Sequence, residues 1–171
     1  MNDSRTRMRE PAFWSAFSLI ALGDVVTKYL AHVLLQPTYR PRDVLGDAVR
    51  LTLVYNPGAA FGLHLGQYSR WIFTVLTIGA VFVLVRLLRE TSPGDRIRLA
   101  AIGLVLGGAI GNLINRLWSS RGVVDFLDLG VGDLRWPTFN VADIGVSIGA
   151  FLLAWTLWAS EQKPSAVSGK P

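Results

Sequence analysis

The chain has 171 residues, of which 51% are hydrophobic and only 17% charged, and its mean hydropathy is +0.38. Soluble domains carry about 25% charged residues, so this composition favours a membrane protein. With no cysteine, the chain cannot form disulfides, thiol nucleophiles or cysteine-ligated metal centres, and two histidines are too few for a histidine-based zinc site. The net charge of +5 comes from scattered arginines, which we interpret as a membrane-topology signal and not as nucleic-acid binding.

Four stretches are long and apolar enough to cross a bilayer core of about 30 Å, which needs roughly 20 helical residues. They cover residues 13–32, 71–88, 99–118 and 139–159. The first stretch has an alternative interpretation as a cleaved signal peptide, because arginines precede it. Its length and its internal Asp24 and Lys28 favour an uncleaved transmembrane helix.

Lysine and arginine are denser near both termini and between the second and third stretches than in the other two connections. Cytoplasmic segments are enriched in these residues, so we expect both termini to lie in the cytoplasm. The predicted fold is therefore an all-α membrane protein with four transmembrane helices and a small β-containing extracytoplasmic loop region. It forms a single integral membrane domain over residues 1–171, ending in a mobile tail at 160–171.

The longest predicted extramembrane segment covers residues 36–70. Within it, residues 49–55 alternate and are rich in β-branched side chains, which predicts a strand. Pro57 and Gly58 end this strand. Residues 59–65 are expected to form a short surface helix.

Polar side chains of the predicted helices gather near one side of the membrane. They lie in the second half of the first helix, at the end of the third and at the start of the fourth, as Asp24, Lys28, Asn112, Arg116, Asn140 and Asp143. With alternating helix directions, all these positions fall on the outer side. Ionisable residues are costly inside the membrane, so we treat those found there as candidate functional residues. Asp24 and Lys28 are four residues apart and can pair, and for this pair alone a purely structural role is favoured.

Asp125 follows two valines and precedes a phenylalanine in the connection between the third and fourth helices. We expect it to lie against the membrane face, close in depth to Asp143. Two carboxylates in a poorly hydrated site cannot both ionise easily, so such a pair shares a proton and can activate water, as in aspartic proteases. Asp128 and Asp133 compete for the same role, although solvated loop positions suit them better.

Glycines recur every four residues in two of the predicted helices, at positions 103, 107 and 111 and at positions 145 and 149. Stripes of small residues allow helix backbones to approach closely. We expect these two stripes to face each other and to pack the third helix tightly against the fourth.

Five short blocks together resemble the lipoprotein signal peptidase (signal peptidase II) family of bacterial four-helix membrane aspartic proteases. The resemblance covers about residues 12–160. The blocks are Asp24-Val-Val-Thr-Lys28, Asn56-Pro-Gly-Ala-Ala-Phe61, Gly107-Gly-Ala-Ile-Gly-Asn112 with Arg116, Val123-Val-Asp125-Phe126, and Phe139-Asn-Val-Ala-Asp143. One departure is Asn115, where the family more often has aspartate.

The resemblance implies an aspartic endopeptidase with Asp125 and Asp143 as its catalytic dyad. It also implies a supporting set around the dyad that binds substrate or orients the carboxylates: Asn56, Gly58, Asn112, Arg116, Asn140, Asp24 and Lys28. The family removes signal peptides from diacylglyceryl-modified prolipoproteins, cleaving before the lipidated cysteine, without a metal or other cofactor. We accordingly expect a monomer among phospholipids of the bacterial cytoplasmic (inner) membrane, with its site toward the extracytoplasmic face.

Two other classes of protein remain as alternatives. A small transporter or proton-conducting protein would use the intramembrane charges as a relay, but its path would also need ionisable residues in the inner halves of the helices, which the sequence lacks. A non-catalytic scaffold or lipid-binding protein would need neither Asp125 nor Asp143.

Overall fold

The computed structural model describes residues 10–60, 63, 64 and 66–161. In chain order its helices are α2 (Pro11–Leu34), η1 (Gly66–Tyr68), α3 (Ser69–Glu90), α4 (Arg96–Trp118) and α5 (Val141–Glu161). Its strands are β1 (Arg42–Leu45), β2 (Val49–Asn56), β3 (Ala59–Ala60), β4 (Leu63–His64), β5 (Val123–Val131) and β6 (Leu134–Arg135). The arginines that precede the first predicted helix (Arg5, Arg7 and Arg9) and residues 162–171 of the predicted tail lie outside the described residues.

Within the described part of the chain, four helices are long and apolar enough to cross a membrane, and each overlaps one of the four predicted stretches. Large apolar side chains cover their outer faces. Leu19, Val75, Phe82 and Phe151, for example, are between 66 and 72% exposed. Water would make such surfaces unfavourable, whereas lipid chains solvate them.

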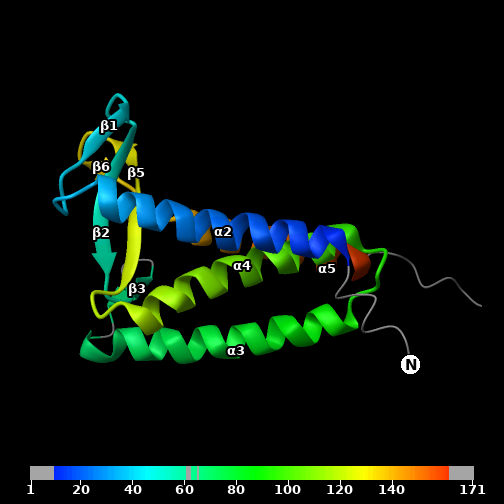
Figure 1. The fold of residues 1–171 in the computed structure, drawn as a ribbon. Coiled ribbons are helices and arrows are strands. Elements are labelled where there is room, and N and C mark those ends of the chain that lie inside the picture. The colour runs from blue at the N-terminus through cyan, green and yellow to red at the C-terminus, as the bar shows by residue number, and fades with distance from the viewer. Residues whose placement is uncertain (1–9, 61–62, 65, 162–171) are drawn as a thin grey trace, which may run out of the picture.

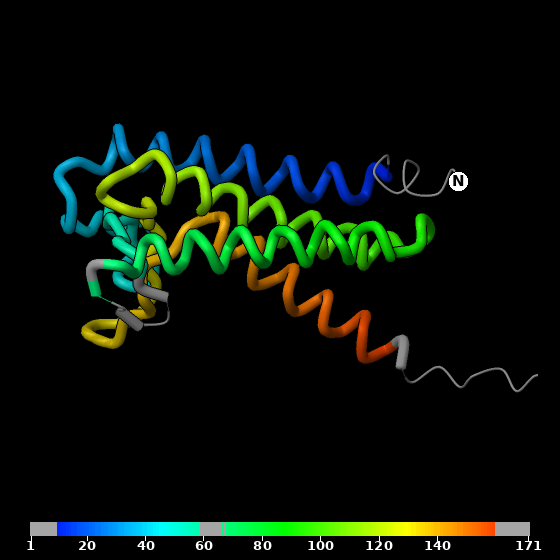
Figure 2. Tube along the Cα trace, turned by 90° about the horizontal axis from the view of Figure 1, so that it is seen from below, coloured from blue at the N-terminus to red at the C-terminus, as the bar shows by residue number. Residues whose placement is uncertain are grey.

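The four long helices lie side by side, and the sheet covers one end of the bundle (Figure 1). The first residues of α2, the last residues of α5 and the turn between α3 and α4 lie at the opposite end. α4 is central, since it packs against α2, α5 and α3. α5 diverges from the other helices toward its C-terminal end (Figure 2).

Glycines bring three helices close together, although not in the arrangement expected. A Cβ atom at position 103 or 107 would meet backbone carbonyls of α2, so this stripe of α4 faces α2 and not α5. Gly108 faces Ala142 at the start of α5, and Gly149 faces the α4 backbone near Ala101. The prediction that the two stripes face each other was therefore wrong, because α4 presents different glycines to α2 and to α5.

The sheet has the strand order β1-β2-β5-β6, and all its pairs are antiparallel. β2 confirms the strand predicted at 49–55. β5, however, forms where a loop between the third and fourth helices was expected, and it pairs with β2 so that Val54 lies opposite Asp125 and Tyr55 opposite Val124. In place of the short helix expected at 59–65, β3 and β4 pair with each other. Residues 61, 62 and 65 of that expectation lie outside the described residues.

Two apolar clusters hold these parts together. At the end far from the sheet, Phe13, Leu84, Leu99 and Ile102 belong to a cluster that joins α2, α3 and α4. At the other end, the last turns of α2 pack on one face of the sheet, through Ala31, Leu35, Leu53, Val124 and Phe126. The opposite face of β2 and β5 is left to line a groove beside α4 and α5.

Candidate active site

A groove with a volume of about 750 Å³ lies between the sheet, α4 and the first turns of α5. Its polar lining includes six of the nine residues predicted from the sequence: Asn56, Gly58, Asn112, Arg116, Asp125 and Asp143. Apolar side chains line the rest, among them Trp136, Phe139, Ile144 and Ile148. This apolar wall was not predicted from the sequence, where its local signal is Trp136, a tryptophan close to a membrane boundary.

Asp125 lies in β5 and is only 2% exposed. Its two carboxylate oxygens accept hydrogen bonds from Asn140 Nδ2 at 2.6 Å and from Asn56 Nδ2 at 3.1 Å. Burial, together with the nearby charge of Asp143, raises the pKa of Asp125 to about 7 in spite of these hydrogen bonds. A carboxyl group with such a pKa can hold a proton close to neutral pH.

Asp143 lies in the first turn of α5, where helix N–H groups attract negative charge. Asn112 Nδ2 donates to its Oδ1 at 2.8 Å, and the backbone N–H of Asn140 donates to its Oδ2 at 3.2 Å. In return, Asn140 Oδ1 accepts from the Asp143 N–H at 3.1 Å. Asn140 also donates from Nδ2 to Asn112 Oδ1 at 3.2 Å. The two asparagines therefore link Asp125 to Asp143 in one hydrogen-bonded network.

Asp24 and Lys28 form the buried ion pair that their spacing predicted, with Lys28 Nζ 2.7 Å from Asp24 Oδ2. Lys28 Nζ also donates to Asn112 Oδ1 at 2.8 Å, and Asp24 Oδ1 accepts from the N–H of Ala142 at 2.9 Å. These contacts tie α2 to α4 and to the first turn of α5. The ion pair is connected to Asp143 through Asn112, which accepts from Lys28 and donates to Asp143.

Asn56 is oriented by the turn that follows β2. The N–H of Gly58 donates to Asn56 Oδ1 at 3.0 Å, which leaves the amide nitrogen to face Asp125. Gly58 has a φ of +120°, and a Cβ atom there would lie 2.8 Å from Ser69 Cβ. Position 58 therefore needs glycine, both for its backbone conformation and for the close approach to α3.

Arg116 lines the same groove as Asp125 and Asp143. Its Nη1 donates to Thr77 Oγ1 at 3.3 Å, and its guanidinium lies 5.9 Å from the ring centre of Phe73. No ion pair joins Arg116 to a carboxylate among the residues described. Asn115, noted as a departure, accepts a hydrogen bond from the N–H of Val124 at 3.0 Å and so fixes the start of β5.

The two competing aspartates lie apart from this network. Asp128 forms an ion pair with Arg135 at 2.8 Å and accepts from Thr52 Oγ1 at 3.0 Å. Asp133 is exposed in the turn between β5 and β6. Neither aspartate belongs to the described lining of the groove. Within residues 10–60, 63, 64 and 66–161, no group of three or more histidine, aspartate or glutamate side chains is arranged to hold a metal ion.

The chain matches known proteins over most of its length. Residues 16–159 match the family model described as signal peptidase (SPase) II. A lipoprotein signal peptidase of Burkholderia mallei is 43% identical over 145 residues, which cover 83% of this chain and 85% of that protein. One from Hydrogenovibrio crunogenus is 44% identical over 142 residues, covering 82% of this chain and 80% of that protein.

Two solved structures are similar in fold, and both are described as bacterial membrane enzymes. One has a TM-score of 0.75 at 28% identity and covers 90% of this chain and 92% of its own. The other has a TM-score of 0.73 at 26% identity and covers 96% of this chain and 99% of its own. The groove with its linked aspartates thus lies in a multi-pass membrane protein whose fold is similar to those of two bacterial membrane enzymes, and the chain belongs to the signal peptidase II family.

Proposed function

We propose that this protein is an aspartic endopeptidase that removes signal peptides from diacylglyceryl-modified prolipoproteins, with Asp125 and Asp143 as its catalytic dyad. The single observation that carries the proposal is the network in which Asn140 and Asn112 link the two carboxylates at one groove. Family membership supports the reaction, and it lends no support to the alternative of a small transporter or proton-conducting protein.

The dyad would divide the chemistry of peptide hydrolysis between its two members. Asp125 would hold the shared proton, because burial raises its pKa to about 7. The ionised Asp143 would take a proton from a water molecule while the water oxygen bonds to the scissile carbonyl carbon. Asp125 would give its proton to the carbonyl oxygen, which leaves a tetrahedral gem-diol intermediate. In its collapse the C–N bond would break, as Asp143 gives the proton that it took from water to the departing nitrogen and a hydroxyl group of the gem-diol returns a proton to Asp125.

The surrounding residues would position this dyad and the substrate. Asn56 and Asn140 donate to Asp125, and Asn112 donates to Asp143, so each carboxylate has a fixed direction. Asp24 and Lys28 would act through Asn112 and α5 as positioning residues. For Gly58 and Arg116 we propose contact with the substrate backbone, since both line the groove.

The lining of the groove suits a substrate that stays anchored in lipid. Asp125 in β5 and Asp143 in the first turn of α5 lie at the sheet end of the lining, while Ile144 and Ile148 continue it along α5. A precursor held by its signal helix and acyl chains can present its scissile bond only near a membrane interface. We propose that this interface is the outer one of the bacterial cytoplasmic membrane, with both termini of the protein in the cytoplasm.

Cleavage of a diacylated prolipoprotein by the purified full-length protein in detergent, followed by gel shift, tests the proposal. Asp125→Asn and Asp143→Asn are each expected to abolish cleavage while leaving expression and membrane insertion near wild type, because asparagine cannot exchange a proton with water or substrate. The matched controls Asp128→Asn and Asp133→Asn are expected to retain most activity. An active Asp125→Asn variant, or loss of activity in EDTA that zinc restores, would refute the dyad.

A further inference from the structure

A second groove, with a volume of about 650 Å³, lies between α2, the end of α4 and the strands β2 and β5. Its lining differs from that of the candidate active site except for Tyr55, which borders both grooves. Tyr55 and Val124, which are paired neighbours, line the second groove. Their sequence neighbours Asn56 and Asp125 line the first.

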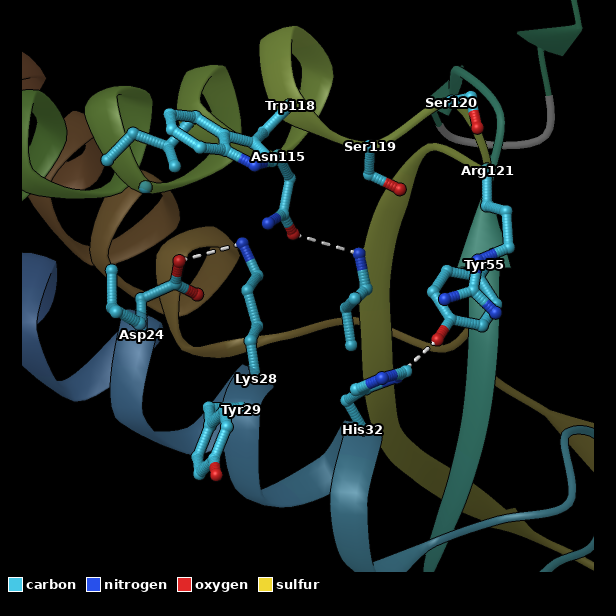
Figure 3. A pocket seen from close by; sticks show the side chains of 14 residues that line it. Asp24, Lys28, Tyr29, His32, Tyr55, Asn115, Trp118, Ser119, Ser120 and Arg121 are labelled. Carbon is cyan, nitrogen blue, oxygen red and sulfur yellow. Dashed lines mark hydrogen bonds and ion pairs between the residues drawn. The ribbon is translucent and has the colours of Figure 1, made fainter.

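The part of this groove beyond the helix ends is basic and rich in hydroxyl groups. The guanidinium of Arg121 lies 4.1 Å from the ring centre of Tyr55, and the Tyr55 hydroxyl lies 2.6 Å from His32 Nδ1. Figure 3 shows Arg121 over this ring, with Ser119 and Ser120 beside it. Among the ion pairs of the described residues, none involves Arg121. The guanidinium therefore lies against an aromatic ring and has no ion-pair partner within the part of the chain that the structure describes.

The part of the groove along the helices is apolar and exposed. Val25 and Tyr29 of α2 are 46 and 65% exposed, and Ile114 and Trp118 of α4 are 44 and 90% exposed. All four belong to helices that can span a membrane, so their exposed surfaces face lipid chains. Trp118 is the last residue of α4. Tryptophan is enriched at the ends of membrane-spanning helices, where it marks the boundary between acyl chains and headgroups.

Other charges near the groove do not oppose an anion. At its base Asp24 forms an ion pair with Lys28, whose Nζ lies 2.7 Å from Asp24 Oδ2, so the negative charge of Asp24 is offset. The C-terminal end of a helix repels anions through its free carbonyl groups. In α4 two of these carbonyls, those of Arg116 and Leu117, already accept hydrogen bonds from Arg70 at 2.5 and 3.2 Å. Arg121 therefore determines the sign of the charge in the basic part.

We propose that this groove binds one anionic phospholipid, with its phosphate on Arg121 and the two serine hydroxyls and one acyl chain along Val25 and Ile114. A guanidinium can bind a phosphate through two parallel hydrogen bonds. A soluble phosphate ester would use the basic part but would leave the apolar wall uncovered. This inference goes beyond the proposed protease function and does not depend on it.

The test is a titration of the full-length protein in neutral detergent with phosphatidylglycerol, read by native mass spectrometry. Wild type is expected to bind one molecule, and Arg121→Ala to bind it about tenfold more weakly, as loss of one charge-assisted contact implies. Arg121→Lys should be intermediate, because lysine keeps the charge without the fork. Arg40→Ala, which removes another exposed arginine, is the matched control and should bind like wild type.

Further arms distinguish the possible ligands. Phosphatidylcholine with the same chains should bind more weakly, and glycerol 3-phosphate or inorganic phosphate should not displace the lipid. Should Arg121→Ala unfold, Ser120→Asp places a carboxylate at an exposed position of the basic part and should weaken binding as strongly. Wild-type affinity in both variants, an equal loss in Arg40→Ala, or displacement by the soluble phosphates would each overturn the proposal. If the protein binds the phospholipid but does not cleave the diacylated prolipoprotein, only the proposed protease function is refuted.

Discussion

Replacing Asn56 with alanine tests how the groove sets the proton affinity of the dyad. Asn56 Nδ2 donates to Asp125 Oδ2 at 3.1 Å, and this bond stabilises the ionised carboxylate. Burial and the charge of Asp143 hold the pKa of Asp125 at about 7, and the hydrogen bond from Asn56 opposes them. Removing a hydrogen bond worth about 1 kcal/mol raises the pKa of the acceptor further, by about 0.7 pH unit.

The assay is the pH dependence of kcat/KM for a lipidated substrate, which reports groups of the free enzyme. If Asp125 must carry the proton, activity declines as pH rises through its pKa. The alkaline limb in Asn56→Ala should therefore move to higher pH, even though the maximal rate falls. Thr52→Val is the control, because Thr52 lies on the same strand but donates to Asp128. A limb that stays in place or moves to lower pH would refute the assignment of the proton to Asp125.

Three further predictions concern charge, packing and topology. Activity should fall from arginine to lysine to alanine at position 116. The alanine variant should also move the alkaline limb of the pH profile to higher pH, because loss of a positive charge raises the pKa of a nearby carboxylate. Full activity of Arg116→Lys, together with an unmoved limb in Arg116→Ala, would contradict this prediction. Gly111→Ala places a methyl group against Asp24 and should lower the free energy of unfolding by about 1–3 kcal/mol. Gly79→Ala should not, because a Cβ atom at that position has no neighbour within 4 Å. A cysteine at Ser120 should react with a membrane-impermeant thiol reagent in spheroplasts, and one at Gly94 only after the cytoplasmic side is opened; the reverse pattern would invert the topology.

The sequence was most informative where local chemistry decides structure. Twenty apolar residues have few options other than a membrane-spanning helix, so hydropathy located all four long helices. The polar positions also had to meet, because alternating helix directions bring Asp24, Asn112 and Asp143 to one depth. Hydrogen bonds now connect these positions through Lys28.

Contacts that depend on distant segments were less predictable. β5 alternates weakly, and it becomes a strand because β2, which precedes it by two long helices, offers an edge for pairing. The rotation of α4 about its axis decides which glycines face α2, and periodicity alone does not fix that rotation. Arg116 points to Thr77 on α3, a neighbour that could not be identified from spacing within α4.

The pairing of β2 with β5 also sets the order in which the protein can be assembled. β2 leaves the ribosome before α3 and α4, and its partner strand follows only after both helices have been made. During that interval one edge of β2 has unpaired backbone groups. Asp125 arrives with β5, and Asp143 arrives last, with α5. A chain arrested before α5 is made lacks Asp143, so under the proposed mechanism it should not cleave substrate.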